Sequence, residues 1–307
     1  MSSRVTVLAG GVGGAKMAHG FQQVLAEGDL SVVVNVADDF EVFGLHISPD
    51  LDTVMYTLAG VANPITGWGI RDDTHRALEM LGRLGGDTWF SIGDADLATH
   101  LRRTRLLADG CSLTDATRSL ATALGVPSHV LPATDQQVAT MLATDAGELD
   151  FQTYFVRRGQ RDEVRAVRFD GLDDARPSAA ALAAIRDADL VVLAPSNPIV
   201  SIGPILELDG MRQAVAASRT VAVSPIVAGR ALKGPADRML ASLGHESTAL
   251  GVARLYAGLV DRFVLDEADA ALAPAVEALG MAVDVLPTVM HSDADRAAVG
   301  RAVLELA

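Results

Sequence analysis

The chain has 307 residues, of which 50% are apolar, and a formal net charge of −14. This length and composition can bury a large core, whereas the charge argues against binding to a nucleic-acid backbone, which depends on clustered Lys and Arg. Cys111 is the single cysteine, so an intrachain disulfide is excluded, and apolar runs stay shorter than the ~18 residues that span a bilayer. The N-terminus also lacks a basic segment followed by a long apolar one. We therefore expect a soluble cytoplasmic protein without a nucleic-acid or membrane partner.

Short β-branched runs alternate with helical periodicity, which is the pattern of a parallel sheet covered by helices. The first helix follows the first strand, and Met17, Phe21, Val24 and Leu25 recur at spacings that place them on one face. We expect one α/β domain over residues 1–307, with a Rossmann-like, doubly wound, mostly parallel sheet. The sequence predicts its strands at residues 5–8, 32–36, 89–92, 129–131, 190–193, 220–223, 262–265 and 283–286.

Two regions depart from this alternation. Residues 58–127 are mainly helical and predict an insertion over the edge of the sheet, with helices at 74–84, 96–107 and 114–124. The more polar stretch 152–174 alternates around Val164 and Phe169, which predicts a small antiparallel hairpin.

A glycine-rich turn joins the first predicted strand to the first helix. Such a turn leaves backbone N–H groups unpaired at a helix N-terminus, where the helix dipole favours an anion. It is not a Walker A loop, because Lys16 is followed by Met17 rather than by Ser or Thr, and it is not a complete dinucleotide fingerprint. A tight turn without any ligand is the alternative interpretation. As a phosphate cradle, the turn would offer Gly10, Gly11, Val12, Gly13, Gly14 and Lys16.

Four aspartates follow the second predicted strand: Asp38, Asp39, Asp50 and Asp52. This carboxyl edge is where open α/β sheets bind ligands. One acidic residue would be enough to hold a ribose, so two further carboxylates in a Pro-initiated turn fit a hard cation better. Magnesium usually takes one or two protein carboxylates, and Asp50 could instead cap the helix that follows it. The sequence predicts a magnesium site among these four residues.

The segment after the third predicted strand carries polar side chains that could reach the same ligand. Ser91 lies within this strand, and Asp94, Asp96, His100 and Arg103 follow it at the start of a predicted helix. Both aspartates could equally well cap that helix. We weigh ligand binding and capping as alternatives for this segment.

A late polar loop follows the predicted strand at 190–193. Proline on both sides of Ser196 and Asn197 fixes these two side chains in an extended, rigid presentation, and Ser201 comes shortly afterwards. Lys233 precedes a predicted helix, where a solvated surface lysine is the alternative to a phosphate ligand. We therefore expect the loop to contribute to the same ligand site.

Nine segments occur in one collinear order over nearly the whole chain, at residues 10–16, 34–39, 47–54, 67–69, 93–100, 151–152, 195–205, 223–226 and 232–236. They include Gly-Gly-Val-Gly-Gly-Ala-Lys, Val-Asn-Val-Ala-Asp-Asp, Ile-Ser-Pro-Asp-Leu-Asp-Thr-Val and Pro-Ser-Asn-Pro-Ile-Val-Ser. This set resembles the 2-phospho-L-lactate transferase family of deazaflavin coenzyme F-420 biosynthesis, which includes phosphoenolpyruvate transferase variants.

The resemblance implies a magnesium-dependent cytoplasmic enzyme that acts as a homodimer. Its donor would be a guanosine diphosphate ester of a three-carbon acid, with 2-phospholactate, phosphoenolpyruvate or phosphoglycerate as the transferred group. Its acceptor would be the terminal ribityl hydroxyl of 7,8-didemethyl-8-hydroxy-5-deazariboflavin, and GMP would leave. The glycine turn and the Ser196–Asn197 loop would bind the guanosine diphosphate, while Asp38, Asp39, Asp50 and Asp52 would hold magnesium or orient the attacking hydroxyl.

The resemblance also implies that Thr53 and Trp68 contact substrate, with the deazaflavin lying against the helical insertion. Ala95 stands where the family often has Arg, which puts one substrate contact in doubt. The alternative is a nucleotide-sugar-binding regulatory protein of the related gluconeogenesis-factor family, but that family should lack the segments at 48–53 and 67–69. A nicotinamide dehydrogenase is disfavoured by Lys16, which stands where the glycine fingerprint needs a small residue.

Overall fold

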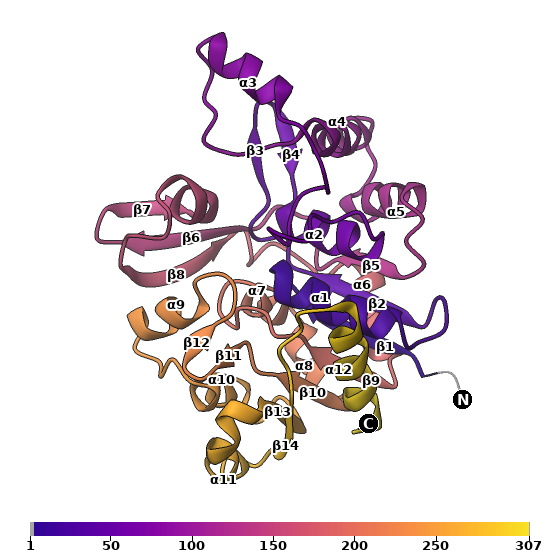
Figure 1. Ribbon diagram of the computed structural model, residues 1–307, viewed down its shortest axis with the longest axis vertical. Coiled ribbons are helices and arrows are strands. Elements are labelled where there is room, and N and C mark those ends of the chain that lie inside the picture. The colour runs from indigo at the N-terminus through magenta and orange to yellow at the C-terminus, as the bar shows by residue number, and fades with distance from the viewer. Residues whose placement is uncertain (1–2, 307) are drawn as a thin grey trace.

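A computed structural model of the chain describes residues 3–306. Its centre is a seven-stranded sheet with the order β14-β13-β10-β9-β1-β2-β5, in which all neighbouring strands run parallel (Figure 1). The predicted α/β fold is therefore confirmed, and seven of the eight predicted strands form this sheet. The strands are β1 (Val5–Ala9), β2 (Leu30–Val34), β5 (His129–Pro132), β9 (Leu190–Leu193), β10 (Thr220–Val223), β13 (Arg262–Asp266) and β14 (Ala282–Leu286).

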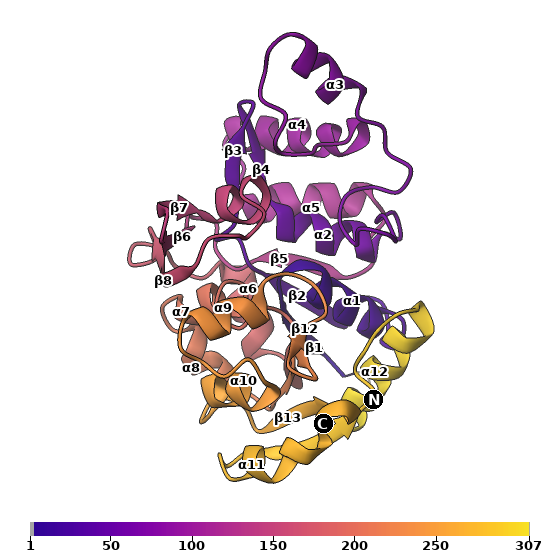
Figure 2. The ribbon, with the colours of Figure 1, turned by 60° about the vertical axis from the view of Figure 1, so that its left-hand side comes forward.

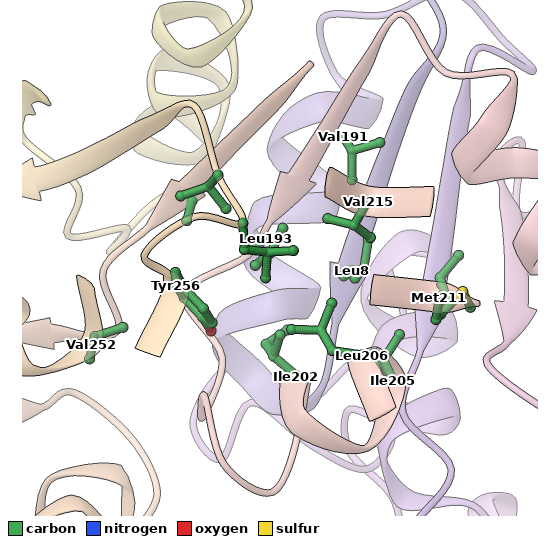
Figure 3. Packing of buried hydrophobic residues seen from close by; sticks show 14 of the residues in the cluster. Leu8, Val191, Leu193, Ile202, Ile205, Leu206, Met211, Val215, Val252 and Tyr256 are labelled. Atoms are coloured by element: carbon green, nitrogen blue, oxygen red, sulfur yellow. The ribbon is translucent and has the colours of Figure 1, made fainter. Parts of the chain in front are cut away.

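Helices cover both faces of the sheet. Successive residues of a strand point to opposite faces, and apolar side chains on both faces are buried by these helices. Val5 and Val7 of β1 pack in one cluster with α1 (Gly11–Gln22), α2 (Pro49–Leu58) and α12 (Asp293–Glu305). Leu8 belongs to the cluster on the other face, where Val191 and Leu193 meet side chains from several helices (Figure 3). Those helices include α6 (Ala179–Arg186), α7 (Ile202–Glu207), α8 (Met211–Ala216) and α10 (Ala249–Tyr256).

Two glycines let α1 and α12 cross in close contact. A Cβ on Gly20 would lie 2.2 Å from the carbonyl oxygen of Arg296, and a Cβ on Gly300 would lie 2.9 Å from the carbonyl carbon of Gly20. Both distances are too short for any side chain. The crossing therefore fixes the position of α1, the helix that begins at the glycine turn.

We expect Gly300→Val to destabilise the fold by about 2–3 kcal/mol, because overpacking at a closed backbone contact forces the helices apart. Thermal unfolding of this variant should be compared with that of Ala298→Val, which places the same side chain on an exposed position of α12. Equal melting temperatures for the two variants would show that the crossing is not tight in solution.

The helical region lies beyond the β5 edge of the sheet, where α3 (Arg76–Arg83), α4 (Asp94–Ala108) and α5 (Leu113–Ala123) stack outward (Figure 2). The three helices predicted here are confirmed, with ends shifted by at most two residues. The strand predicted at 89–92 is wrong. Trp89 and Phe90 instead pack against Phe40 in a hairpin of β3 (Phe40–Val42) and β4 (Leu45–Ile47). The assignment of one domain with an insertion at 58–127 stays a prediction.

A second, antiparallel sheet has the order β7-β6-β8 and consists of β6 (Ala139–Thr144), β7 (Gly147–Asp150) and β8 (Val164–Asp170). The predicted hairpin within 152–174 is therefore wrong, because β8 pairs with β6 and Thr153–Arg157 forms a π-helical turn.

Within residues 3–306, no helix is long and apolar enough to cross a membrane. The remaining elements are β11 (Ile226–Val227), β12 (Arg230–Ala231), α9 (Ala236–Ser242), a 3-10 helix (Glu267–Leu272) and α11 (Ala273–Glu277).

Candidate active site

A cavity of about 350 Å³ lies at the carboxyl ends of β1 and β9. The turn after β1 and the loop after β9 both line it. From these two neighbouring strands the sheet continues through β2 and β5 on one side and through β10 and β13 on the other. The cavity therefore occupies the topological switch point, which is the usual ligand site of a doubly wound sheet.

Close contacts with the 195–201 loop explain two glycines of the turn. A Cβ on Gly13 would lie 2.2 Å from the carbonyl oxygen of Pro195, and a Cβ on Gly10 would lie 2.7 Å from Cβ of Ser201. The N–H of Gly10 donates to Ser196 Oγ at 3.1 Å, and that hydroxyl donates to the Gly10 carbonyl at 2.8 Å. The turn and the loop thus form one rigid part of the cavity wall.

The N-terminus of α1 points into this cavity. Its first turn contains no acidic residue, and Val12 and Gly13 line the cavity. First-turn N–H groups have no acceptor within their own helix. The N–H of Gly11 donates to Asp50 Oδ1 at 2.7 Å, so a carboxylate already lies at this helix end. The site can hold an anion beside Asp50 if a cation offsets the two negative charges.

Asp38 and Asp50 share one amide group. Asn35 Nδ2 donates to Asp38 Oδ2 at 3.2 Å and to Asp50 Oδ2 at 3.0 Å. Asp38 is buried, and its Oδ1 has no hydrogen-bond partner. Burial, together with the charge of Asp50, raises the pKa of Asp38 well above its usual range, and burial raises the pKa of Asp50 to about 6. Such a pair of oxygen ligands suits a divalent cation.

The other two aspartates have different partners. Asp39 Oδ2 accepts from Ser48 Oγ at 2.7 Å and lies 3.2 Å from His46 Nε2. Asp52 binds both terminal nitrogens of Arg103, whose side chain is 1% exposed. Among residues 3–306, no three of the four predicted aspartates bring one oxygen each within 4.8 Å of one another. The predicted four-residue cluster is therefore divided among separate partners.

The helix α4 carries three of the predicted substrate-binding residues to this region. Asp96 and His100 line the cavity, whereas Arg103 does not line it and binds Asp52 through its two terminal nitrogens. Asp52, Asp96 and His100 could together offer three ligand atoms to a metal ion. The guanidinium of Arg103, which lies 3.0 Å from Asp52 Oδ2 and 3.4 Å from His100 Nδ1, already supplies positive charge there and disfavours a second cation.

Asp94 has a capping role in the structure. It accepts hydrogen bonds from the backbone N–H groups of Arg76 and Ala77 at the start of α3, and from the Thr74 hydroxyl at 2.5 Å. It does not belong to the cavity lining, whereas the neighbouring Ser91 does. Capping of α4 by these aspartates is therefore wrong, because Asp94 caps α3 and the first N–H groups of α4 donate to Asp73 instead. The ligand alternative remains for Asp96.

Aromatic side chains line another part of the cavity. Phe151 and Phe155 stack with ring centroids 5.4 Å apart at an interplanar angle of 9°, and Phe90 and Trp68 also line the wall. Trp68 is 50% exposed. The turn that carries Trp68 lies against the glycine turn, because a Cβ on Gly67 would meet Val12 at 2.7 Å. The cavity thus combines a polar region, with carboxylates and helix N–H groups, and an aromatic region.

The two predicted lysines differ in position. Lys16 Nζ donates to the Met290 carbonyl at 2.8 Å and lies outside the cavity lining, where burial and the charges of Arg296 and Lys233 lower its pKa. Lys233 lines the cavity, and its Nζ donates to the Thr66 carbonyl at 3.4 Å. It is the only Lys or Arg in the lining that the described residues provide.

The predicted side chains of the 195–201 loop mainly hold the loop itself. Asn197 Oδ1 accepts from the backbone N–H groups of Ile199 and Val200 at 2.9 and 3.3 Å. Ser196, Asn197 and Ser201 all line the cavity, as does Thr53. The loop therefore combines a self-supporting turn with polar atoms at the cavity wall.

A family model for the 2-phospho-L-lactate transferase CofD matches residues 5–291. The chain therefore belongs to the 2-phospho-L-lactate transferase family. It is 42% identical to the phosphoenolpyruvate transferase of Streptomyces griseus, with 99% of this chain and 98% of the relative covered. It is 39% identical to the 2-phospho-L-lactate transferase of Methanopyrus kandleri, with coverage of 100% and 98%. A crystal structure of a UPF0052 family protein from Bacillus halodurans shares the fold, with a TM-score of 0.62 at 16% identity over 99% of both chains.

The site residues that sequence reasoning missed in this member of the transferase family include Asn35, Tyr56, Phe90, Phe151, Gln152 and Phe155. Tyr56 follows Asp52 by four residues, and this spacing places two side chains on the same face of a helix. Asn35 and Gln152 each lie inside a motif already noted, and Gln152 Nε2 donates to the Asp38 carbonyl at 3.2 Å. Phe151 lies in the same motif as Gln152, whereas Phe90 and Phe155 carried no comparable signal, because their segments meet only in the folded chain.

Proposed function

We propose that this chain transfers a phosphorylated three-carbon acid from its guanosine diphosphate ester to the terminal ribityl hydroxyl of 7,8-didemethyl-8-hydroxy-5-deazariboflavin, releasing GMP. Membership of the 2-phospho-L-lactate transferase family supports the reaction class. The observation that carries the proposal is the single cavity that joins a helix N-terminus and a carboxylate pair to an aromatic wall. One region suits a diphosphate and the other a planar ring.

The donor is proposed to lie in the polar region. Its diphosphate would meet the N-terminus of α1, the 195–201 loop and Lys233. Asp38 and Asp50 would hold the magnesium ion, since Asp38 Oδ1 is buried without a partner and both residues offer only oxygen ligands. When bound there, magnesium neutralises charge on the diphosphate and on the departing GMP.

The chain contributes mainly positioning to this reaction. The Gly11 N–H and the Asn35 amide fix both oxygens of Asp50 beside the helix N-terminus. The attacking hydroxyl oxygen forms a bond to the phosphorus that carries the acid, and the bond from this phosphorus to the GMP oxygen breaks. The hydroxyl proton passes to the released GMP phosphate or to solvent, so the exchange balances. Rigid contact between the turn and the 195–201 loop keeps these groups aligned.

The deazaflavin is proposed to lie in the aromatic region. Phe90, Phe155 and Trp68 offer ring faces and edges to a planar heterocycle, and the Phe151–Phe155 stack holds one of these rings in place. This placement directs the ribityl chain toward the carboxylates.

We further propose that the enzyme is a homodimer of the cytoplasm, as the family resemblance implies. Sedimentation of the purified chain measures its oligomeric state.

The direct test is reconstitution with magnesium, the deazaflavin acceptor and each of the three guanosine diphosphate esters in turn. Mass spectrometry should show one esterified deazaflavin product together with an equal amount of GMP. Binding of guanosine nucleotides without any product from the three donors would refute the transferase proposal and favour a regulatory nucleotide-binding role.

We expect Lys233→Ala to raise the KM for the donor about three- to tenfold and to leave the KM for the acceptor unchanged. The side chain is exposed, so solvent screens its charge and limits its effect on a phosphate. Arg230→Ala, three residues earlier in the chain, is the matched control, because Arg230 is also exposed but does not line the cavity. Equal donor KM values in the two variants would remove Lys233 from the site.

A further inference from the structure

Asp96 lines the cavity, and the protein engages one of its two carboxylate oxygens. The Tyr56 hydroxyl donates to Asp96 Oδ1 at 2.7 Å, and His100 Nε2 lies 3.3 Å from the same oxygen. The Asp96 side chain is 14% exposed and lines the cavity. Within residues 3–306, Oδ2 receives no hydrogen bond from the protein. The two oxygens of this carboxylate therefore have different surroundings.

Arg103 sets the orientation of the His100 proton. Its Nη1 lies 3.4 Å from His100 Nδ1, and because arginine can only donate, Nδ1 must be the acceptor. With Nδ1 as the acceptor, the ring carries a proton on Nε2, which lies 3.3 Å from Asp96 Oδ1. Asp52 holds Arg103 in place from the other side. Tyr56 thus holds Oδ1 directly, and Arg103 and His100 are further positioning residues beside it, so Oδ2 is the oxygen left available to a ligand.

This arrangement restricts the ligands that Asp96 can bind. A guanidinium group or the Watson–Crick edge of guanine needs both carboxylate oxygens, and Oδ1 already faces two protein donors. Burial works to raise the pKa of Asp96, but His100, the Tyr56 hydroxyl and the Arg103 charge together lower it. The group therefore remains ionised, and Oδ2 keeps lone pairs for two hydroxyl donors.

We propose that Asp96 Oδ2 binds a pair of adjacent hydroxyl groups on a substrate. This inference rests on the proposed function, in which the ribityl chain of the acceptor and the ribose of the guanosine nucleotide both carry such hydroxyls. Acidic residues bind ribose hydroxyls in the same way at the edge of other doubly wound sheets. The position of Asp96 on α4, within the same cavity as Ser91 and Phe90, favours the ribityl chain.

The test uses Asp96→Asn and four probes: the deazaflavin acceptor, an N-alkyl deazaflavin with the same ring but no hydroxyls, GDP and 2′,3′-dideoxy-GDP. In the variant, the Tyr56 hydroxyl keeps the amide oxygen on its own side, so the NH2 group faces the cavity and replaces an acceptor by a donor. We expect about tenfold to hundredfold weaker binding of the polyol ligand and unchanged binding of its hydroxyl-free counterpart. A loss for the acceptor identifies the ribityl chain, and a loss for GDP identifies the ribose.

Asp109→Asn at the other end of α4 is the matched control, because its carboxylate pairs with Arg105 on the surface. Equal affinities of Asp96→Asn and the wild type for both polyols would overturn the inference. An equal loss for a ligand with and without hydroxyls would also overturn it, since that pattern indicates general damage to the cavity. Product formation by the wild type together with either of these results refutes only this inference. A wild-type protein that binds none of the four probes refutes the proposed function and this inference with it.

Discussion

Asp38→Asn is expected to lower kcat/KM for the transfer by at least about a hundredfold while stabilising the metal-free protein. The loss follows because a neutral amide is a poor ligand for a hard cation and leaves the diphosphate charge unbalanced. The stabilisation follows because the wild type buries the carboxylates of Asp38 and Asp50 next to each other, with one Asn35 amide group donating to both. The substitution keeps the shape of the side chain, and the new NH2 group can donate toward the neighbouring Thr140 hydroxyl.

The pH dependence of this effect has a defined sign. The folded protein raises the pKa of Asp38, so the buried group destabilises the folded wild type little at pH 4. This destabilisation grows as the pH rises through the raised pKa. The difference in free energy of unfolding between Asp38→Asn and the wild type should therefore be small near pH 4 and largest near pH 8. Urea unfolding at both pH values, in the presence of a chelator, measures it.

Magnesium should reverse the order of stability. Added at pH 8, it should raise the melting temperature of the wild type, because a ligand that binds only the folded state stabilises it. It should leave Asp38→Asn unchanged. Asp209→Asn, at an exposed position after α7, is the control and should respond as the wild type does. Near-normal turnover of Asp38→Asn with an unchanged magnesium response would contradict the placement of the cation on Asp38 and Asp50.

The central sheet was predictable because its strands are short β-branched runs that are buried on both faces. The hairpin of β3 and β4 was missed, since each strand has only three residues and the pattern around Phe40 is too short to show a period. The segment at 89–92 has the aromatic composition of a strand. Its rings pack instead on Phe40, so tertiary contact decided its conformation.

The location of the site was predictable, but the grouping of its carboxylates was not. The glycine turn and the 195–201 loop follow adjacent parallel strands, so topology alone brings them together. Asp50 and Asp52 are two residues apart on α2, and this spacing turns them about 200° from each other around the helix axis. One faces Asn35 and the other faces Arg103. A helix over residues 49–58 therefore predicts that Asp50 and Asp52 point to different partners.

Arg103→Met is expected to destabilise the fold by about 3–5 kcal/mol, which is the range for leaving a buried charge without its partner. Asp52 is 5% exposed and binds both terminal nitrogens of Arg103, and the nearest remaining group is His100 Nδ1 at 3.6 Å. Urea unfolding gives the free energy directly. The matched control is Arg105→Met on the same helix, whose pair with Asp109 is exposed and should contribute less than about 1 kcal/mol.

The double variant Asp52→Leu with Arg103→Met separates the ion pair from the space that it fills. Replacing both charges by apolar groups removes the unpaired carboxylate, and such replacements of buried pairs are often neutral or stabilising. The double variant should therefore unfold at a higher urea concentration than Arg103→Met alone, although it carries one more substitution. If instead the two losses add, the coupling between Asp52 and Arg103 is absent, and α4 is held to α2 by its apolar contacts rather than by this pair.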